Sequence, residues 1–228
     1  MLYAISDLHL SLSGDKPMSV FGDRWKNHAH KLKTNWERTV RPDDTVLVAG
    51  DISWAMRIGE AAVDLDFLDA LPGKKICMPG NHDYWWGSTD RVKKLYPDMV
   101  FLKYNCCEYK NYTICAARGW LSPGDSHFDV NTDTKIYNRE LTRFETALDS
   151  AVKYGSENII LSMHFPPAGE RFKHAGFFNI IKRYPVKKII FGHLHGVHPG
   201  AYDNVSIKHI ECMLVSCDYL NFTPAAVL

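Results

Sequence analysis

The chain has 228 residues, of which 46% are hydrophobic and 23% charged, a composition typical of a globular protein with an ample core. A formal net charge of +1 gives no basic surface for long-range attraction of nucleic acid or an anionic membrane. Neither is therefore expected as a partner.

The cysteines and the N-terminus indicate a cytoplasmic protein. The six cysteines form no C-x-x-C pair, which favours free thiols in a reducing compartment over a disulfide framework or a cysteine-zinc site. The first residues do not form the apolar run of a signal peptide, and no apolar run approaches the ~20 residues that span a bilayer.

The first part of the chain alternates buried strands with helices. Apolar runs predict strands at 2–6, 45–49 and 75–78. Amphipathic spacing and capping residues predict helices at 28–40, 59–71 and 88–96. This order implies parallel strands joined by right-handed crossovers.

The middle of the chain changes character, and the last part resumes the first pattern. Strands are predicted at 99–102, 106–109, 112–117, 158–163, 188–191, 205–207 and 210–216. A polar loop, Gly119–Thr134, is long enough to suggest a function. Helices are predicted at 135–154 and 177–184. No repeat or linker divides the sequence, so residues 1–228 are predicted to form a single domain.

Side chains that bind metals follow five of the predicted strands. They are Asp7, His9, Asp51, Asn81, His82, Asp83, His164, His193 and His195. Ligands of open α/β sheets bind at the carboxyl ends of strands, so these side chains are expected to converge. Oxygen donors mixed with imidazoles suit Mn, Fe or Zn better than Ca or Mg. Seven potential ligands are too many for one ion and about right for two, and two-metal sites catalyse in-line displacement at phosphorus.

These blocks, in this order, resemble those of the calcineurin-like metallophosphoesterases. The blocks are Asp7-x-His9, Gly50-Asp51, Gly80-Asn81-His82-Asp83, Met163-His164 and Gly192-His193-x-His195. The resemblance implies an α/β fold, a four-layer α/β/β/α sandwich of two mixed β-sheets flanked by helices. The chain also resembles the small bacterial members of this family.

The resemblance implies a role for each residue of these blocks. Asp7, His9 and His195 are expected to bind the first metal ion. Asn81, His164 and His193 are expected to bind the second, with Asp51 bridging both. A metal-bridging hydroxide would attack phosphorus in line, and His82 would protonate the departing alcohol as a general acid. Asp83 is expected to cap a helix or brace His82 rather than bind metal.

Two departures from the family pattern narrow the activity. The Ser/Thr protein phosphatases have Asp-Arg where this chain has Trp54-Ala55, so a protein phosphatase is disfavoured. The purple acid phosphatases have a metal-binding Tyr at the position of Trp54, so a tyrosinate-coloured iron site is not expected. The expected substrate is a small phosphodiester or phosphomonoester, such as a nucleotide.

Residues near the blocks suggest substrate contacts. Trp54, Trp85 and Trp86, together with Trp120, either pack in the core or stack on a base or sugar, and packing is favoured for at least two of them. Arg118, at the end of a strand, is the best candidate for a phosphate contact.

Two other functions compete with a small-molecule phosphohydrolase. A nuclease of the same fold is disfavoured by the near-neutral charge and the small size. A scaffold that keeps the fold without catalysis is disfavoured because every ligand block and His82 are intact. The sequence leaves open the native metals, the choice between diester and monoester, and the oligomeric state.

Overall fold

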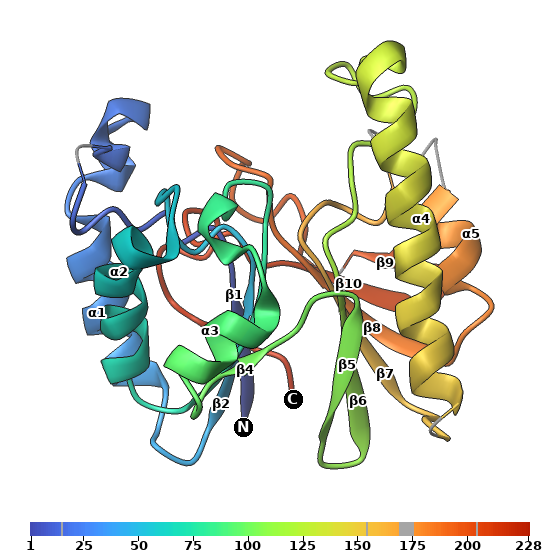
Figure 1. Cartoon of the computed structure of the whole chain (residues 1–228), viewed down its shortest axis with the longest axis horizontal. Coiled ribbons are helices and arrows are strands. Elements are labelled where there is room, and N and C mark those ends of the chain that lie inside the picture. The colour runs from blue at the N-terminus through green and yellow to red at the C-terminus, as the bar shows by residue number, and fades with distance from the viewer. Residues whose placement is uncertain (15, 154, 169–175, 204) are drawn as a thin grey trace.

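Two β-sheets packed face to face form the centre of the molecule, and helices cover both outer sides (Figure 1). This is a computed structural model, and it describes residues 1–14, 16–153, 155–168, 176–203 and 205–228. The predicted α/β sandwich of two mixed sheets is confirmed.

The first sheet contains the strands of the N-terminal part of the chain. Its described strands run in the order β11-β1-β2-β3-β4. Their bounds are Ala225–Ala226 (β11), Leu2–Ile5 (β1), Thr45–Ala49 (β2), Lys74–Met78 (β3) and Val100–Phe101 (β4). β1 to β4 are parallel, and β11 is antiparallel to β1.

The second sheet contains the later strands. Its described strands run in the order β5-β6-β7-β8-β10-β9. Their bounds are Asn105–Tyr109 (β5), Tyr112–Ala117 (β6), Ile159–Met163 (β7), Val186–Phe191 (β8), Ile210–Leu214 (β10) and Ser206–Ile207 (β9). β6, β7, β8 and β10 are parallel, whereas the edge strands β5 and β9 are antiparallel to their neighbours.

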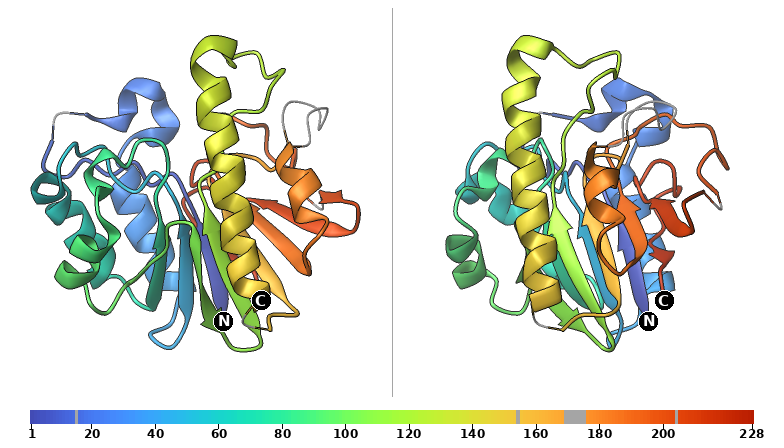
Figure 2. Two further views of the ribbon diagram at one scale, coloured as in Figure 1. Left: turned by 45° about the vertical axis from the view of Figure 1, so that its right-hand side comes forward. Right: turned by 90° about the vertical axis from the view of Figure 1, so that its right-hand side faces the viewer.

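The helices divide between the two outer faces, as Figure 2 shows from two further directions. The first sheet is covered by α1 (His28–Thr39), α2 (Ile58–Ala70) and α3 (Thr89–Leu95). The second is covered by α4 (Val130–Lys153) and α5 (Gly176–Ile181). Short 3-10 helices, which the sequence did not predict, are η1 (Met18–Phe21), η2 (Asp23–Trp25) and η3 (Tyr84–Trp86).

Alternation along the strands produces three apolar layers, because successive side chains of a strand point to opposite faces. On β2, Leu47 belongs to the cluster between the sheets, which also holds Ile160 and Ile190 of the second sheet. Its neighbours Val46 and Val48 belong to the cluster beneath α1 to α3. A third cluster fills the space between the second sheet and its helices. A four-layer sandwich follows directly from this pattern.

The two sheets meet next to the predicted site. Ser6, just after β1, forms a parallel bridge with Ser216, just after β10. The Ser6 amide donates to the Val215 carbonyl at 2.8 Å, and the Cys217 amide donates to the Ser6 carbonyl at 2.9 Å. The carboxyl ends of strands from both sheets are therefore held side by side.

Some boundaries differ from the predictions. α4 begins at Val130 and not at 135, because the Asp129 side chain accepts a hydrogen bond from the Asn131 amide at 2.8 Å, as an N-cap does. The last turn of the predicted loop, Gly119–Thr134, is therefore helical. Tyr154, the predicted end of this helix, lies outside the described residues. The two-residue strand β11 was not predicted.

The core and the helices bear on two further predictions. The cluster between the sheets contains residues of both, which agrees with one domain over 1–228; the domain boundaries stay a prediction. Among the described residues, no helix is both long enough and apolar enough to span a bilayer.

Candidate metal centre

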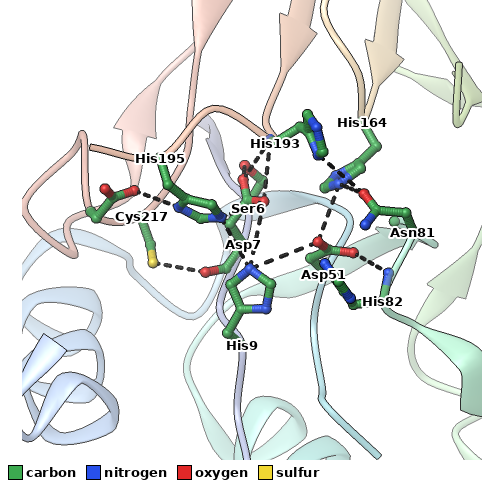
Figure 3. Close-up of polar contacts among 12 residues, drawn as sticks. Ser6, Asp7, His9, Asp51, Asn81, His82, His164, His193, His195 and Cys217 are labelled. Atoms are coloured by element: carbon green, nitrogen blue, oxygen red, sulfur yellow. Dashed lines mark hydrogen bonds and ion pairs between the residues drawn. The ribbon is translucent and has the colours of Figure 1, made fainter. Parts of the chain in front are cut away.

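The predicted metal-binding residues lie together where strands of both sheets end (Figure 3). Each lies within four residues of the end of a strand, so the parallel alignment of those strands brings them to one edge. The first sheet supplies Asp7, His9, Asp51 and Asn81, and the second supplies His164, His193 and His195. A ligand bound here would contact both sheets.

Asp7, His9 and His195 form the first cluster of possible ligands. Their donor atoms lie within 4.8 Å of one another. His9 Nε2 and His195 Nε2 are 3.1 Å apart, and His195 Nε2 is 3.4 Å from Asp7 Oδ1. These are the residues predicted to hold the first metal ion.

The second cluster surrounds His164. His164 Nε2 lies 2.9 Å from Asn81 Oδ1 and 3.3 Å from Asp51 Oδ2. His193 Nδ1 lies 3.1 Å from the same Asn81 oxygen. Asp51 Oδ2 is also 3.7 Å from His9 Nε2, so this carboxylate lies between the two clusters. That position suits the predicted bridging role.

The donor set fits a pair of metal ions. The Ala49 carbonyl is 3.0 Å from His164 Nδ1, so this nitrogen carries a proton, and in the neutral ring the Nε2 lone pair would be available to a metal ion. That lone pair faces the Asp51 and Asn81 oxygens, which are also acceptors. A proton or a cation must hold such acceptors together. Mixed nitrogen and oxygen donors suit Mn, Fe or Zn.

The pKa values of two histidines show how strongly the site attracts a cation. Burial alone would lower the pKa of His164, but the Asp51 and Asp7 carboxylates and the Ala49 carbonyl together outweigh burial and raise that pKa to about 9. Burial opposes ionisation of His195 too, and hydrogen bonds to Asp218 and Asp7 raise its pKa to about 10. By contrast, burial lowers the pKa of His9 to about 4. The carboxylates of this site therefore favour positive charge at His164 and His195.

The backbone is strained at the same place. Asp7, His9, Asp51 and His193 have φ values of 59°, 44°, 52° and 70°. Residues other than glycine seldom adopt this left-handed region, at a cost of about 1–3 kcal/mol each, and such strain clusters at functional sites. Gly80 permits the close approach of two loops here, because a Cβ on it would overlap the Asp51 carboxylate.

Asp218 belongs to the site, although the sequence did not single it out. Its Oδ1 is 3.0 Å from His195 Nδ1, and its Oδ2 accepts the Gly196 amide at 2.9 Å. It thereby directs His195 Nε2 toward Asp7 and His9. The signal was present, since Asp218 also follows soon after a predicted strand, 210–216.

His82 and Asp83 have different surroundings. The His82 amide donates to Asp51 Oδ1 at 2.8 Å, while the half-buried ring lies 4.3 Å from the Trp54 ring, centroid to centroid. Burial lowers the pKa of His82. The Asp83 carboxylate accepts the amides of Ile52, at 2.9 Å, and Gly80, at 2.8 Å. Asp83 therefore ties the loops after β2 and β3 together, in neither of the two roles expected for it.

A cavity of about 830 Å³ opens on this cluster. His9, Asp51, His82, His193 and His195 form one end of it. The other walls come from Met18, Phe21, Arg24 and Trp25 around η1 and η2, and from the loop 196–199. The wall formed by residues 18–25 was not predicted from the sequence.

The structure places the residues predicted to contact the substrate in different surroundings. Trp54 lines the cavity, but Trp85 and Trp86 are 3% and 2% exposed and lie in the core beneath α1 to α3, as the packing interpretation expects. Arg118 is absent from the described cavity lining, and its Nη2 lies 3.3 Å from Glu140 Oε1. Its carbonyl accepts the His164 amide at 3.1 Å, so the Arg118 backbone supports the site.

The sequence model of calcineurin-like phosphoesterases matches residues 2–197. The chain therefore belongs to the calcineurin-like phosphoesterase family. The family resemblance seen in the motif blocks is confirmed.

Two curated proteins resemble part of the chain. It is 37% identical over 92 residues to the [acyl-carrier-protein] phosphodiesterase PptH of Mycobacterium tuberculosis, a match covering 40% of this chain and 23% of that protein. It is 33% identical over 78 residues to the Gene 66 protein of Mycobacterium phage L5, covering 34% of this chain and 37% of that protein. The match thus spans less than two-fifths of either relative.

The structure of the phosphopantetheinyl hydrolase PptH from Mycobacterium tuberculosis has a TM-score of 0.56 to this chain at 19% identity. That similarity covers 97% of this chain and 90% of the other. At this identity it supports the fold alone.

Proposed function

We propose that the chain is a dinuclear metal-dependent phosphodiesterase for a small substrate. The observation that carries the proposal is the pair of adjoining donor clusters, with Asp51 Oδ2 3.3 Å from His164 Nε2 and 3.7 Å from His9 Nε2. One ion would be held by Asp7, His9 and His195, and the other by Asn81, His164 and His193. Asp51 would reach both.

The metal ions, which we propose to be Mn²⁺, Fe or Zn²⁺, would lower the pKa of a bound water to about 7 and neutralise charge on the phosphoryl oxygens. The bond from the water oxygen to phosphorus forms as the bond to the alcohol oxygen breaks. His82 lies beside Asp51 and lines the cavity, so it is placed to give its proton to that departing oxygen. The proton that the water loses restores His82, and the products are a phosphomonoester and an alcohol.

A diester is favoured over a monoester by the surroundings of the metal centre. A monoester carries more negative charge, and phosphatases of monoesters use arginine side chains to bind it. Among the described cavity walls the one arginine is Arg24, whose Nη1 donates to the Asp218 carbonyl at 3.2 Å. The names given to the similar protein PptH, an [acyl-carrier-protein] phosphodiesterase and phosphopantetheinyl hydrolase, agree with this choice. A phosphopantetheinyl diester is therefore a substrate to test first.

The decisive experiment compares wild type with Asp51→Asn on bis-p-nitrophenyl phosphate, with Mn²⁺ and with a chelator. We expect chelator-sensitive hydrolysis by wild type and a loss of at least ~100-fold in Asp51→Asn, because the amide cannot bridge two cations. Asp43→Asn, an exposed change far from the site, is the control. Equal activity in Asp51→Asn and the control would disprove the two-metal mechanism.

A further inference from the structure

We infer that the cavity beside the metal centre binds the departing alcohol, and that this alcohol carries a slender, uncharged and mainly apolar chain, not a nucleoside. The inference rests on the proposed phosphodiesterase function and specifies its substrate class. It is carried by the chemistry of the cavity walls and by the position of His82.

The position of His82 decides which arm of the diester enters the cavity. In an in-line displacement the leaving oxygen lies opposite the attacking water, next to the group that protonates it. His82 is that group in the proposed mechanism, and its ring lines the cavity together with Trp54. The chain attached to the leaving oxygen therefore extends between η1–η2 and the loop 196–199, while the retained arm lies outside.

The walls beyond His82 are mainly apolar. Of the polar side chains there, Arg24 donates to the Asp218 carbonyl at 3.2 Å, and His198 Nδ1 lies 2.9 Å from the Pro199 carbonyl oxygen. Met18 and Trp25, which are 4% and 5% exposed, form one side, and Val197 and Pro199 belong to the loop on another. Phe21, at 67% exposure, stands at the rim. Walls of this kind recognise a chain by burial of its methylene groups, at roughly 0.8 kcal/mol for each CH₂.

The lining has few groups that would read a base or a ribose. Among the described lining residues there is no Asn, Gln, Ser or Thr, and the carboxylates are Asp51 and Asp218. Asp51 belongs to the metal centre, and Asp218 is engaged with His195 and Gly196. Base recognition through hydrogen bonds would need such groups to be free.

The aromatic walls are also engaged. The Trp54 ring stacks on His9 with centroids 4.7 Å apart, approaches the His82 ring, and has Lys16 Nζ 5.6 Å from its centroid. The Trp25 ring makes edge contacts with His9, His195 and Phe222. A base needs a free aromatic face to stack on. An alkyl chain can instead be buried against rings that already have neighbours.

The test uses two diesters that share a small retained arm, methyl n-hexyl phosphate and methyl thymidine 5′-phosphate. Manganese-loaded wild type, Phe21→Ala and Leu95→Ala are compared by kcat/KM, with products identified by chromatography. Leu95 is a matched control, since it is 55% exposed on α3 and absent from the described cavity lining. Inhibition of bis-p-nitrophenyl phosphate hydrolysis by n-hexyl phosphate and by thymidine 5′-phosphate gives the same comparison if turnover is slow.

We expect wild type to prefer the hexyl ester by at least ~10-fold and to release hexanol with methyl phosphate. Phe21→Ala should reduce that preference several-fold, and Leu95→Ala should not. Equal or better turnover of the thymidine ester, release of methanol with hexyl phosphate, or an unchanged preference in Phe21→Ala would each overturn the inference. If bis-p-nitrophenyl phosphate itself is not hydrolysed, the proposed function fails, and the inference fails with it.

Discussion

Individual side chains around the metal centre are held by neighbours that do not themselves bind metal. His164 depends on the Ala49 carbonyl, and His195 depends on Asp218. The sequence predicted the inner residues because each stands in a motif of fixed spacing after a strand. It did not predict Asp218, because no motif marks an acid that acts on a ligand 23 residues earlier in the chain.

Asp218→Asn should weaken metal binding roughly 10- to 100-fold, because a residue that is hydrogen-bonded to a metal-binding histidine fixes the tautomer and orientation of its ring. Isothermal titration of the chelator-treated protein with Mn²⁺ measures this without any substrate. Asp43→Asn removes an equal charge at an exposed site and should leave the affinity unchanged. An Asp218→Asn affinity equal to that of the control would show that Asp218 does not position His195.

Whole elements were predicted where one pattern dominates and missed where tertiary contacts decide. The long apolar strands after Met1, Pro42 and Gly73 were located to within a residue or two, since burial demands such runs. The start of α4 was misplaced because Asp129 caps it inside a polar segment. η1 and η2, which wall the cavity, are too short to leave a periodic pattern.

At the element scale, α4 is fixed to the second sheet by a buried carboxylate. Glu140 is 1% exposed, and its Oε1 accepts from Tyr104, Arg118 and Arg143 at 3.1–3.3 Å. Each of these partners is at least partly accessible. Solvent can therefore replace part of the interaction that a partner loses when the carboxylate is removed.

Glu140→Gln should therefore lower the free energy of unfolding by about 1–3 kcal/mol, the range for hydrogen bonds to a charged group. Urea denaturation measures the change. The control on the same helix is Glu145→Gln, whose partly exposed ion pair with Arg183 should contribute less than ~1 kcal/mol. Equal effects of the two substitutions would show that burial of Glu140 does not strengthen its contacts.

At the scale of the whole molecule, the candidate metal centre contains residues from two sheets, which also meet through their apolar faces and the Ser6–Ser216 bridge. Alternation along each strand predicted the layers, whereas the ligand assignments follow from the family resemblance and stay a prediction. The cavity could not be predicted, because its walls come from segments around residues 18–25 and 196–199 that come together only in the folded chain.

Because its ligands come from both sheets, bound metal should stabilise the whole fold. At a free concentration of 100 times Kd, a ligand that binds only the native state adds about 2.7 kcal/mol. We expect Mn²⁺ to raise the Tm of wild type above its value in chelator, and to leave the Tm of Asp51→Asn nearly unchanged.

Leu47→Ala, which empties part of the layer between the sheets, should lower stability by about 2–5 kcal/mol with or without metal. Its metal-induced shift should persist, because Leu47 lies in the core and not among the ligands. A shift lost in Leu47→Ala but kept in Asp51→Asn would contradict a metal centre that joins the sheets through Asp51.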